Sequence, residues 1–235
     1  MLIPYASSSK GNFYEVWDGY SRILLECGVP PKRMRVLCGR QLSDYGACLI
    51  THEHSDHAKA ASAAELGMLG VRLCASAGTF DALNLQFRHG YDCSIARAGE
   101  LIDIAGYHVM PFPVFHDCAE PLCYGIESRV TGERLFFAVD TSCLLGTGEG
   151  FDEIALECNY SEDYLMDSKL DHVVVERIRR NHMSIERVLE WLKASDLTRT
   201  RLIWLLHISA NHGDALLFRR MVEGTTGICT RIASA

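Results

Sequence analysis

The sequence predicts an α/β fold with two β-sheets faced by helices, and we expect residues 1–235 to form a single domain. Apolar, strand-like runs flank short turns in both halves of the chain, as they do in β-hairpins. A short apolar run, a histidine-rich loop and a helix-forming stretch follow one another around residues 47–66. A later segment repeats apolar residues with the period of an amphipathic helix. Because both halves contain the same mixture, layers of sheets and helices are expected.

The first half of the chain begins with a predicted hairpin. Its strands, residues 13–17 and 22–27, flank Asp18-Gly19, a pair typical of hairpin turns. Residues 29–46 mix Pro, Arg and Gly, which indicates a connection that includes a short helix. The other predicted elements of this half are a buried strand at 47–50, an alanine-rich helix at 58–66, a strand at 71–75 and a helix at 76–85.

The second half contains another predicted hairpin, in which residues 124–130 and 134–139 flank a Thr-Gly-Glu turn. Residues 107–115 are expected to be extended, because they contain two prolines. Four apolar residues recur at helical spacing after Ser184, a typical N-cap; they are Ile185, Val188, Leu189 and Leu192. The other predicted elements are strands at 154–158 and 201–206 and a last helix at 215–222, ended by Gly224.

Composition narrows the class of protein. The 235 residues are 48% hydrophobic and 23% charged, which is typical of a globular domain. The net charge of −7 and the absence of a Lys/Arg-rich tail argue against strong non-specific nucleic-acid binding. The start does not resemble a signal peptide, and no apolar run reaches the roughly 18 residues of a membrane span. Since the ten cysteines are scattered without a Cys-x-x-Cys pair, we expect a cytoplasmic protein that binds no membrane.

The most informative segment is residues 51–57, which contain the pattern His-x-His-x-Asp-His. Imidazole and carboxylate groups are the usual ligands of zinc, manganese and iron. Chance alone would produce this pattern in about one of a thousand such chains. Four ligands in one tight loop cannot all reach a single ion without strain, so the spacing predicts two adjacent ions. His52 and His54 would bind one ion, and Asp56 and His57 the other.

Two ions need further ligands, and polar residues at the ends of apolar runs are the candidates. His116, Asp140 and His207 each follow such a run. Asp140 is the best candidate for a carboxylate that bridges the two cations. The position of His182 before a helix leaves open whether it has a role. The remaining histidines considered, for which an ordinary structural or surface role is expected, are His89, His108, His172 and His212.

With these residues in place, the chain resembles the metallo-β-lactamase fold superfamily. Within its phosphodiesterase branch it is most similar to the YycJ/WalJ-type DNA exonucleases and their phage relatives. The matching segments begin with the Ser-rich turn at 6–12 and the His-x-His-x-Asp-His motif, and continue with residues 115–117, 138–141, 157–160, 181–184 and 206–211. Departures from the family pattern are Glu26, Ser142 and Asn181. The resemblance implies a four-layer αββα sandwich of two mixed sheets faced by helices.

The resemblance also implies roles for the candidate residues. His52, His54 and His116 would bind the first ion, Asp56, His57 and His207 the second, and Asp140 both. The ions would be Zn²⁺ or Mn²⁺, with Fe²⁺ also compatible, and would activate a water that attacks phosphorus. Asp56 would orient that water and His182 would protonate the leaving oxygen, although exchanged roles of His182 and His207 stay open. The residues that either bind a substrate phosphate or only shape turns are Ser184, Asn211 and the Ser7–Ser9 turn.

We therefore predict a dinuclear-metal-dependent hydrolase of phosphodiester bonds, most consistent with a DNA exonuclease. The alternatives are a small-nucleotide or RNA phosphodiesterase, a thioester hydrolase resembling glyoxalase II, and a binding protein without catalysis. His182 favours the first, because a leaving-group acid suits phosphodiester cleavage. The acidic net charge is the physical objection to a DNA substrate. The densest groups of arginines, which either contact phosphates or are ordinary solvated charges, are Arg33, Arg35, Arg177, Arg179, Arg180, Arg199 and Arg201. The oligomeric state is left open.

Overall fold

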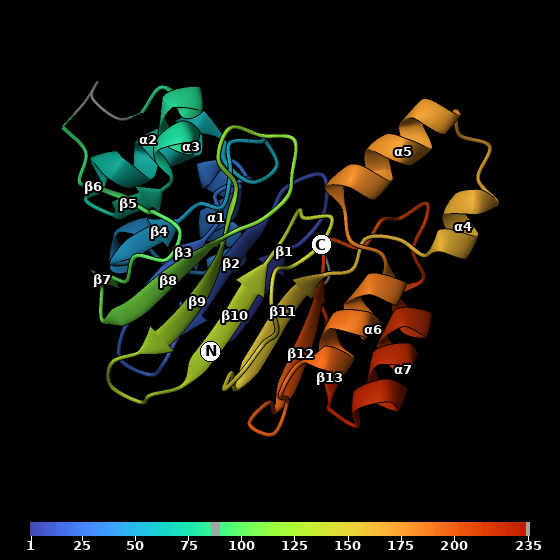
Figure 1. Cartoon of the computed structure of the whole chain (residues 1–235). Coiled ribbons are helices and arrows are strands. Elements are labelled where there is room, and N and C mark those ends of the chain that lie inside the picture. The colour runs from blue at the N-terminus through green and yellow to red at the C-terminus, as the bar shows by residue number, and fades with distance from the viewer. Residues whose placement is uncertain (86–89, 234–235) are drawn as a thin grey trace.

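Two mixed β-sheets packed face to face form the centre of the computed structural model, which describes residues 1–85 and 90–233 (Figure 1). The first sheet has six strands in the order β1-β2-β3-β4-β5-β6, and the second has seven in the order β13-β12-β11-β10-β9-β8-β7. In each sheet, antiparallel pairs at one side give way to parallel pairs at the other. The prediction of two sheets faced by helices is thus confirmed.

The first sheet and its helices use the first half of the chain. Its strands are β1 (Leu2–Ala6), β2 (Phe13–Trp17), β3 (Arg22–Leu25), β4 (Ala47–Leu49), β5 (Arg72–Ala75) and β6 (Cys93–Ile95). The helices are α1 (Pro31–Cys38), α2 (Ala60–Met68) and α3 (Ala77–Leu83), with a 3₁₀ turn at Leu42–Asp44. The predicted hairpin is confirmed, because β2 and β3 pair antiparallel with Tyr14 opposite Leu25.

The second sheet follows in the second half. Its strands are β7 (Ile102–Ile104), β8 (Tyr107–Pro113), β9 (Leu122–Ser128), β10 (Arg134–Ala138), β11 (Glu153–Glu157), β12 (Leu202–Leu206) and β13 (Thr230–Ile232). The helices are α4 (Glu162–Met166), α5 (His172–Asn181), α6 (Ile185–Ala194) and α7 (Ala215–Thr226). The second predicted hairpin, β9–β10, is confirmed, as is the Ser184 N-cap, whose side chain accepts a hydrogen bond from the Arg187 N–H.

Successive side chains of a strand face opposite layers. Ile23 and Leu25 belong to the apolar cluster between the two sheets, whereas Leu24 belongs to the cluster beneath α1–α3. A third cluster packs β10–β12 against α6 and α7. Figure 1 shows α1–α3 on the outer face of one sheet, α6 and α7 on the outer face of the other, and α4–α5 projecting beside them. The order of layers is therefore helix, sheet, sheet, helix.

The predicted end of the last helix was wrong. The last helix does not end at Gly224 but continues to Thr226, where Gly227 caps it with a left-handed φ of 70°. A Cβ at Gly224 would have no heavy atom within 4 Å, so this glycine faces open space and interrupts no packing.

Two elements that bear on the site, β1 and α5, lay in stretches where no element was predicted. Across residues 1–85 and 90–233, the structure contains no helix with the length and hydropathy of a membrane span.

Candidate metal centre

The candidate site lies where strands of both sheets end at the same edge of the sandwich. The loop after β4 carries the four ligands predicted from residues 51–57, and Asp140 and His207 follow β10 and β12 closely. His116 lies in the connection between β8 and β9. Since parallel strands place their carboxyl ends along one edge, ligands from both sheets meet there. The seven residues predicted as ligands are all brought together at this edge.

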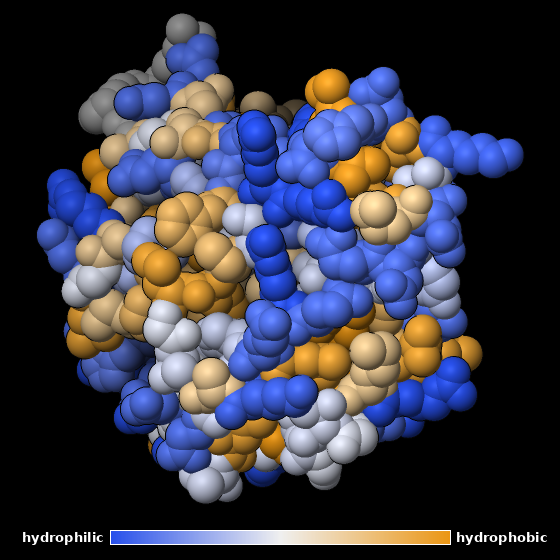
Figure 2. All heavy atoms as spheres, turned by 45° about the vertical axis from the view of Figure 1, so that its right-hand side comes forward, coloured by the Kyte–Doolittle hydropathy of each residue, from blue (hydrophilic) through white to orange (hydrophobic). Residues whose placement is uncertain are grey.

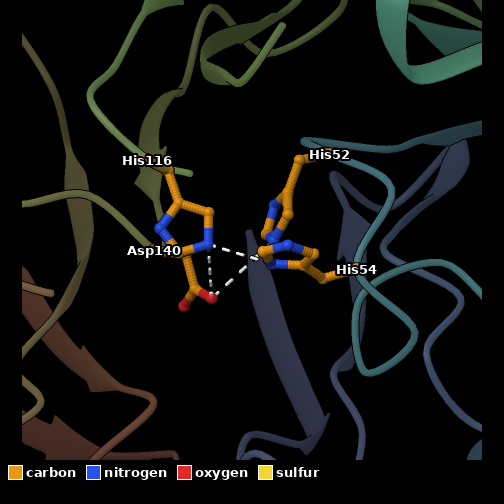
Figure 3. A group of neighbouring side chains, drawn as sticks. All are labelled: His52, His54, His116 and Asp140. Atoms are coloured by element: carbon orange, nitrogen blue, oxygen red, sulfur yellow. Dashed lines mark hydrogen bonds and ion pairs between the residues drawn. The ribbon is translucent and has the colours of Figure 1, made fainter. Parts of the chain in front are cut away.

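The first cluster consists of His52, His54, His116 and Asp140, whose ligand atoms lie within 4.8 Å of one another. His116 Nε2 is 3.1 Å from His54 Nδ1 and 3.5 Å from Asp140 Oδ2, and His52 Nε2 is 3.7 Å from the same oxygen. Figure 3 shows these side chains converging on one point from separate segments. The geometry is that of four donors directed at a common position.

The second cluster consists of Asp56, His57, Asp140 and His207. His57 Nε2 lies 3.2 Å from Asp140 Oδ2 and 3.4 Å from Asp56 Oδ2, and His207 Nδ1 lies 2.5 Å from Asp140 Oδ1. His207 Nε2 is 3.7 Å from Asp56 Oδ2. Asp140 therefore belongs to both clusters, which is the arrangement expected of a carboxylate shared by two neighbouring cations.

The donor atoms of both clusters fit divalent cations. Ligands around a tetrahedral ion with bonds of about 2.0–2.2 Å lie roughly 3.3–3.6 Å apart, close to the separations observed here. His52 Nε2 is buried and has no hydrogen-bond partner among the described residues. This nitrogen is therefore available as a metal ligand within the first cluster. Nitrogen and carboxylate donors suit zinc, manganese and iron, whereas no cysteine takes part in either cluster.

The carboxylates favour positive charge at this edge of the fold. Burial would raise the pKa of Asp140, but His207 and His57 hold it well below its usual range. Burial would likewise lower the pKa of His207, yet Asp140 and Glu157 raise it to about 10. In contrast, burial lowers the pKa of His52 well below its ordinary value, which keeps that imidazole neutral and able to bind a metal. A divalent cation satisfies the same electrostatic preference as a proton on these histidines.

Backbone strain is concentrated at the site. Glu26, Asp140 and His207 have positive φ angles of 65°, 45° and 49°, a backbone conformation that residues other than glycine rarely adopt. All three lie just after a strand, where the chain turns sharply to aim a side chain at the clusters. Such strain is stored at sites where the surrounding structure fixes the geometry.

A surrounding set of buried polar groups orients the ligands. Thr51 Oγ1 lies 2.9 Å from His52 Nδ1, and His116 Nδ1 donates to the Asn181 carbonyl at 3.0 Å. The His207 N–H donates to Ser7 Oγ at 2.9 Å, which ties β1 to the end of β12. Contacts of this kind fix the ring orientation and the tautomer of metal-binding histidines. Sequence reasoning gave none of these roles, although Ser7 was noted within a Ser-rich turn.

His182 makes a short contact with a buried glutamate. Its Nδ1 lies 2.6 Å from Glu157 Oε1, while its distance to Asp140 Oδ1 is 3.9 Å. Glu157 is fully buried and also accepts hydrogen bonds from the Thr141 and Met183 N–H groups. Burial would lower the pKa of His182, but Glu157 raises it. Sequence reasoning assigned no role to Glu157; its position at the end of β11, like that of Asp140 near β10, was the available signal.

A cavity of about 270 Å³ opens onto both clusters and onto His182. Its lining outside the clusters includes Ser9, Arg177 and Asn181. Ser184 and Asn211 do not line it: Ser184 is buried as the cap of α6, and Asn211 is exposed in the loop after β12, where its N–H donates to Ser209 Oγ. His182 is thus brought into the site, whereas these two polar residues are not.

The other four histidines lie outside both clusters or outside the described residues. His108 is on β8 and pairs with Asp103, His172 begins α5 with a highly exposed side chain, and His212 contacts Ser209. His89 falls outside the part of the chain that the structure describes. None of the three described histidines belongs to a group of potential metal ligands.

Gly28 allows the chain after β3 to approach the ligand loop closely. A Cβ at this position would lie 1.7 Å from the Asp56 carbonyl oxygen. We expect Gly28→Ala to displace the loop and to lower metal affinity by about 10–100-fold, as disturbed ligand positioning does. Metal content per chain after dialysis against a weak chelator measures this effect. Gly224→Ala, at a position with no atom within 4 Å, is the matched control, and equal metal loss in both variants would contradict the prediction.

Comparison with known proteins gives a consistent family. A family model described as a β-lactamase superfamily domain matches residues 21–208. The exodeoxyribonuclease YycJ of Bacillus anthracis is 25% identical over 236 residues, covering 93% of this chain and 86% of the relative. The exodeoxyribonuclease WalJ of Streptococcus pneumoniae is 27% identical over 221 residues, covering 87% and 80%. The metallo-β-lactamase fold protein YhfI from Bacillus subtilis superposes with a TM-score of 0.75 at 13% identity, over 99% of this chain and 95% of that chain.

Proposed function

Because the chain belongs to the β-lactamase superfamily, whose domain model covers residues 21–208, we propose that it is a dinuclear metal-dependent phosphodiesterase that degrades DNA from an end. The chain is a hydrolase with the metallo-β-lactamase fold. We assign His52, His54 and His116 to the first ion, Asp56, His57 and His207 to the second, and Asp140 to both. Zn²⁺ or Mn²⁺, or Fe²⁺, matches these donors.

The pairing of His182 with Glu157 is the observation that carries this proposal. An imidazole held at 2.6 Å by a buried carboxylate lines the cavity that both clusters share. Glu157 fixes the ring so that Nε2 is free to face a substrate atom. In this position His182 can protonate an alkoxide leaving group, which is the oxygen released when a phosphodiester bond is cleaved. A thioester leaves as a thiolate, which needs such an acid far less.

The remaining residues position the reacting groups. When bound, the two cations activate a water for attack and offset the negative charge of the phosphoryl oxygens. Asp56 is 23% exposed and lines the cavity, so its carboxylate can orient a water beside the scissile phosphate. His182 lines the same cavity beside His207, with the two ring centroids 5.6 Å apart, and can hold the proton for the departing oxygen.

The relatives and the cysteines support the proposed substrate and setting. Both curated relatives are named exodeoxyribonucleases, which supports DNA over a small nucleotide or RNA. All ten cysteines are free, which supports a reducing, cytoplasmic setting. The acidic net charge means that binding depends on the metals and on local arginines rather than on the overall field.

The test is release of nucleotides from end-labelled linear duplex DNA in Mn²⁺ or Zn²⁺. We expect stepwise mononucleotide release by the wild type and none by a His52→Ala/Asp140→Ala variant whose far-ultraviolet circular dichroism matches the wild type. Hydrolysis of bis(p-nitrophenyl) phosphate without attack on DNA would assign a small-nucleotide or RNA substrate instead. Hydrolysis of a thioester alone would assign the glyoxalase II-like alternative.

A further inference from the structure

Helix α5 forms one wall of the catalytic cavity and extends beyond it. Val174, Arg177, Ile178 and Asn181 line that cavity, at the i, i+3, i+4, i+7 spacing of a single helix face. A second cavity of about 430 Å³ is lined by seven residues, of which Asp117, Arg177 and Asn181 also line the catalytic cavity. The two cavities adjoin at these three residues, and we call the hollowed surface that they form along α5, from the metal-ligand clusters outward, the groove.

Two arginines of this groove are not held by a close ion pair. Arg177 has a side chain 75% exposed, and its Nε is 3.8 Å from Asp117 Oδ2, too far for a hydrogen bond. Arg180 is exposed and makes no ion pair or hydrogen bond with any described residue. Arg179 is different, because it pairs with Glu162 at 2.7 Å and Glu176 at 2.9 Å and so fastens α5 to α4. Although Glu176 also lines the groove, Arg179 neutralises its charge.

Apolar side chains lie exposed beside these arginines. Val173 is 74% exposed and Val174 42% exposed, and Met166 and Leu170 at the α4–α5 connection are 67% and 38% exposed. Figure 2 turns the side of the molecule with α4 and α5 toward the viewer. Hydrophobic residues lie next to strongly hydrophilic ones in the upper right of this view. Exposed apolar groups gathered at one place mark a binding surface more often than isolated ones do. Sugar and base faces of a nucleic-acid strand present complementary apolar surface.

We propose that Arg177 and Arg180 bind backbone phosphates of the DNA strand that leads away from the scissile bond, while Val173 and Val174 contact its sugars or bases. Residues three apart on a helix have Cβ atoms about 5–6 Å apart, which is of the order of the spacing between successive phosphates. Guanidinium groups bind phosphate oxygens in a bidentate manner. The groove therefore selects a polymer over a mononucleotide. This inference rests on the proposed function, because it extends the same site.

The test measures binding of a short fluorescein-labelled single strand with cleavage-resistant phosphorothioate linkages to the metal-loaded protein. We expect Arg177→Gln/Arg180→Gln to raise Kd by roughly tenfold and to lower the slope of log Kd against log salt by about 1.4, since each phosphate contact to a single strand contributes about 0.7. Lys193→Gln/Arg220→Gln removes the same charge from exposed positions on α6 and α7 and should leave Kd within about twofold. In turnover, the loss of kcat/KM on the oligonucleotide should exceed the loss on bis(p-nitrophenyl) phosphate by about fivefold.

The outcomes separate this inference from the proposed function. A tenfold loss confined to the α5 pair supports it. Equal loss in both pairs, or no loss while the wild type still binds and degrades DNA, overturns the groove and leaves the exonuclease proposal intact. A wild type that neither binds the strand nor releases nucleotides overturns both.

Discussion

Replacing His182 with Ala is expected to lower phosphodiester turnover by about 10²–10⁴-fold while both ions stay bound, because a positioned general acid contributes that much. His182 stands apart from the two clusters that contain the predicted ligands, and its Nδ1 is committed to Glu157 at 2.6 Å. Removal of the ring takes away the proton for the leaving oxygen but no donor from either cluster. Turnover of bis(p-nitrophenyl) phosphate should fall less than turnover of DNA, since p-nitrophenolate departs without a proton.

His207→Ala is the matched control for this prediction. His207 lies 2.5 Å from Asp140 and belongs to the second cluster, so its loss should remove metal as well as activity. Metal content per chain, measured by inductively coupled plasma mass spectrometry, separates the two variants. Asp140, Glu157, His182 and His207 also form a third group with donors within 4.8 Å of one another. Loss of metal from His182→Ala but not from His207→Ala would therefore exchange the two assignments.

The clustering of the candidate ligands could be predicted from the sequence because each of them, or the loop that carries it, follows an apolar run. The end of an alternating or continuous apolar run marks the end of a strand. A His or Asp that follows it directly is therefore expected at the edge of a sheet. His116, Asp140 and His207 were found in this way, and the structure brings them to the loop after β4. The paired hairpins were equally visible, since turn residues between apolar runs act locally.

The supporting contacts could not be predicted, because they join segments far apart in the chain. Ser7 meets His207 across 200 residues, and Glu157 meets His182 across 25. Helix α5 buries only Val175 and Asn181, and Val175 and the partly buried Ile178 pack with Tyr160 and Leu165 in a small cluster separate from the main core. An apolar pattern this short did not identify the helix in the sequence. The end of α7 was predicted at Gly224 because the sequence does not show the surroundings of this glycine. In the structure it faces open space, and the helix continues past it.

The positive φ angles of the site also lie beyond sequence reasoning. Nothing in the local pattern distinguishes Asp140, at φ 45°, from an ordinary residue after a strand. The conformation is imposed by burial and by contacts with His57 and His207 on two other segments. Such a residue is strained locally and held by the rest of the fold.

Asp140→Asn is expected to abolish binding of both ions, with metal affinity reduced by more than about 100-fold, since loss of a shared ligand exceeds the 10–100-fold cost of an outer contact. Asp140 is the member common to all the groups of potential metal ligands in the described chain. Asparagine keeps the volume and tolerates positive φ, so the substitution isolates the charge from the backbone strain. Asp140→Ala would combine both effects.

The control for Asp140→Asn is the same substitution at Asp81, which is exposed on α3 and belongs to neither cluster. Equilibrium dialysis with Zn²⁺ and with Mn²⁺ gives the number of ions bound to each variant. If Asp140→Asn kept one ion at wild-type affinity, Asp140 would serve only the other cluster and would not bridge. If it kept both, the carboxylate would only orient His57 and His207. Loss of both ions from Asp140→Asn, with Asp81→Asn unchanged, is the result that a shared ligand requires, because one carboxylate would then contribute to the coordination of both ions.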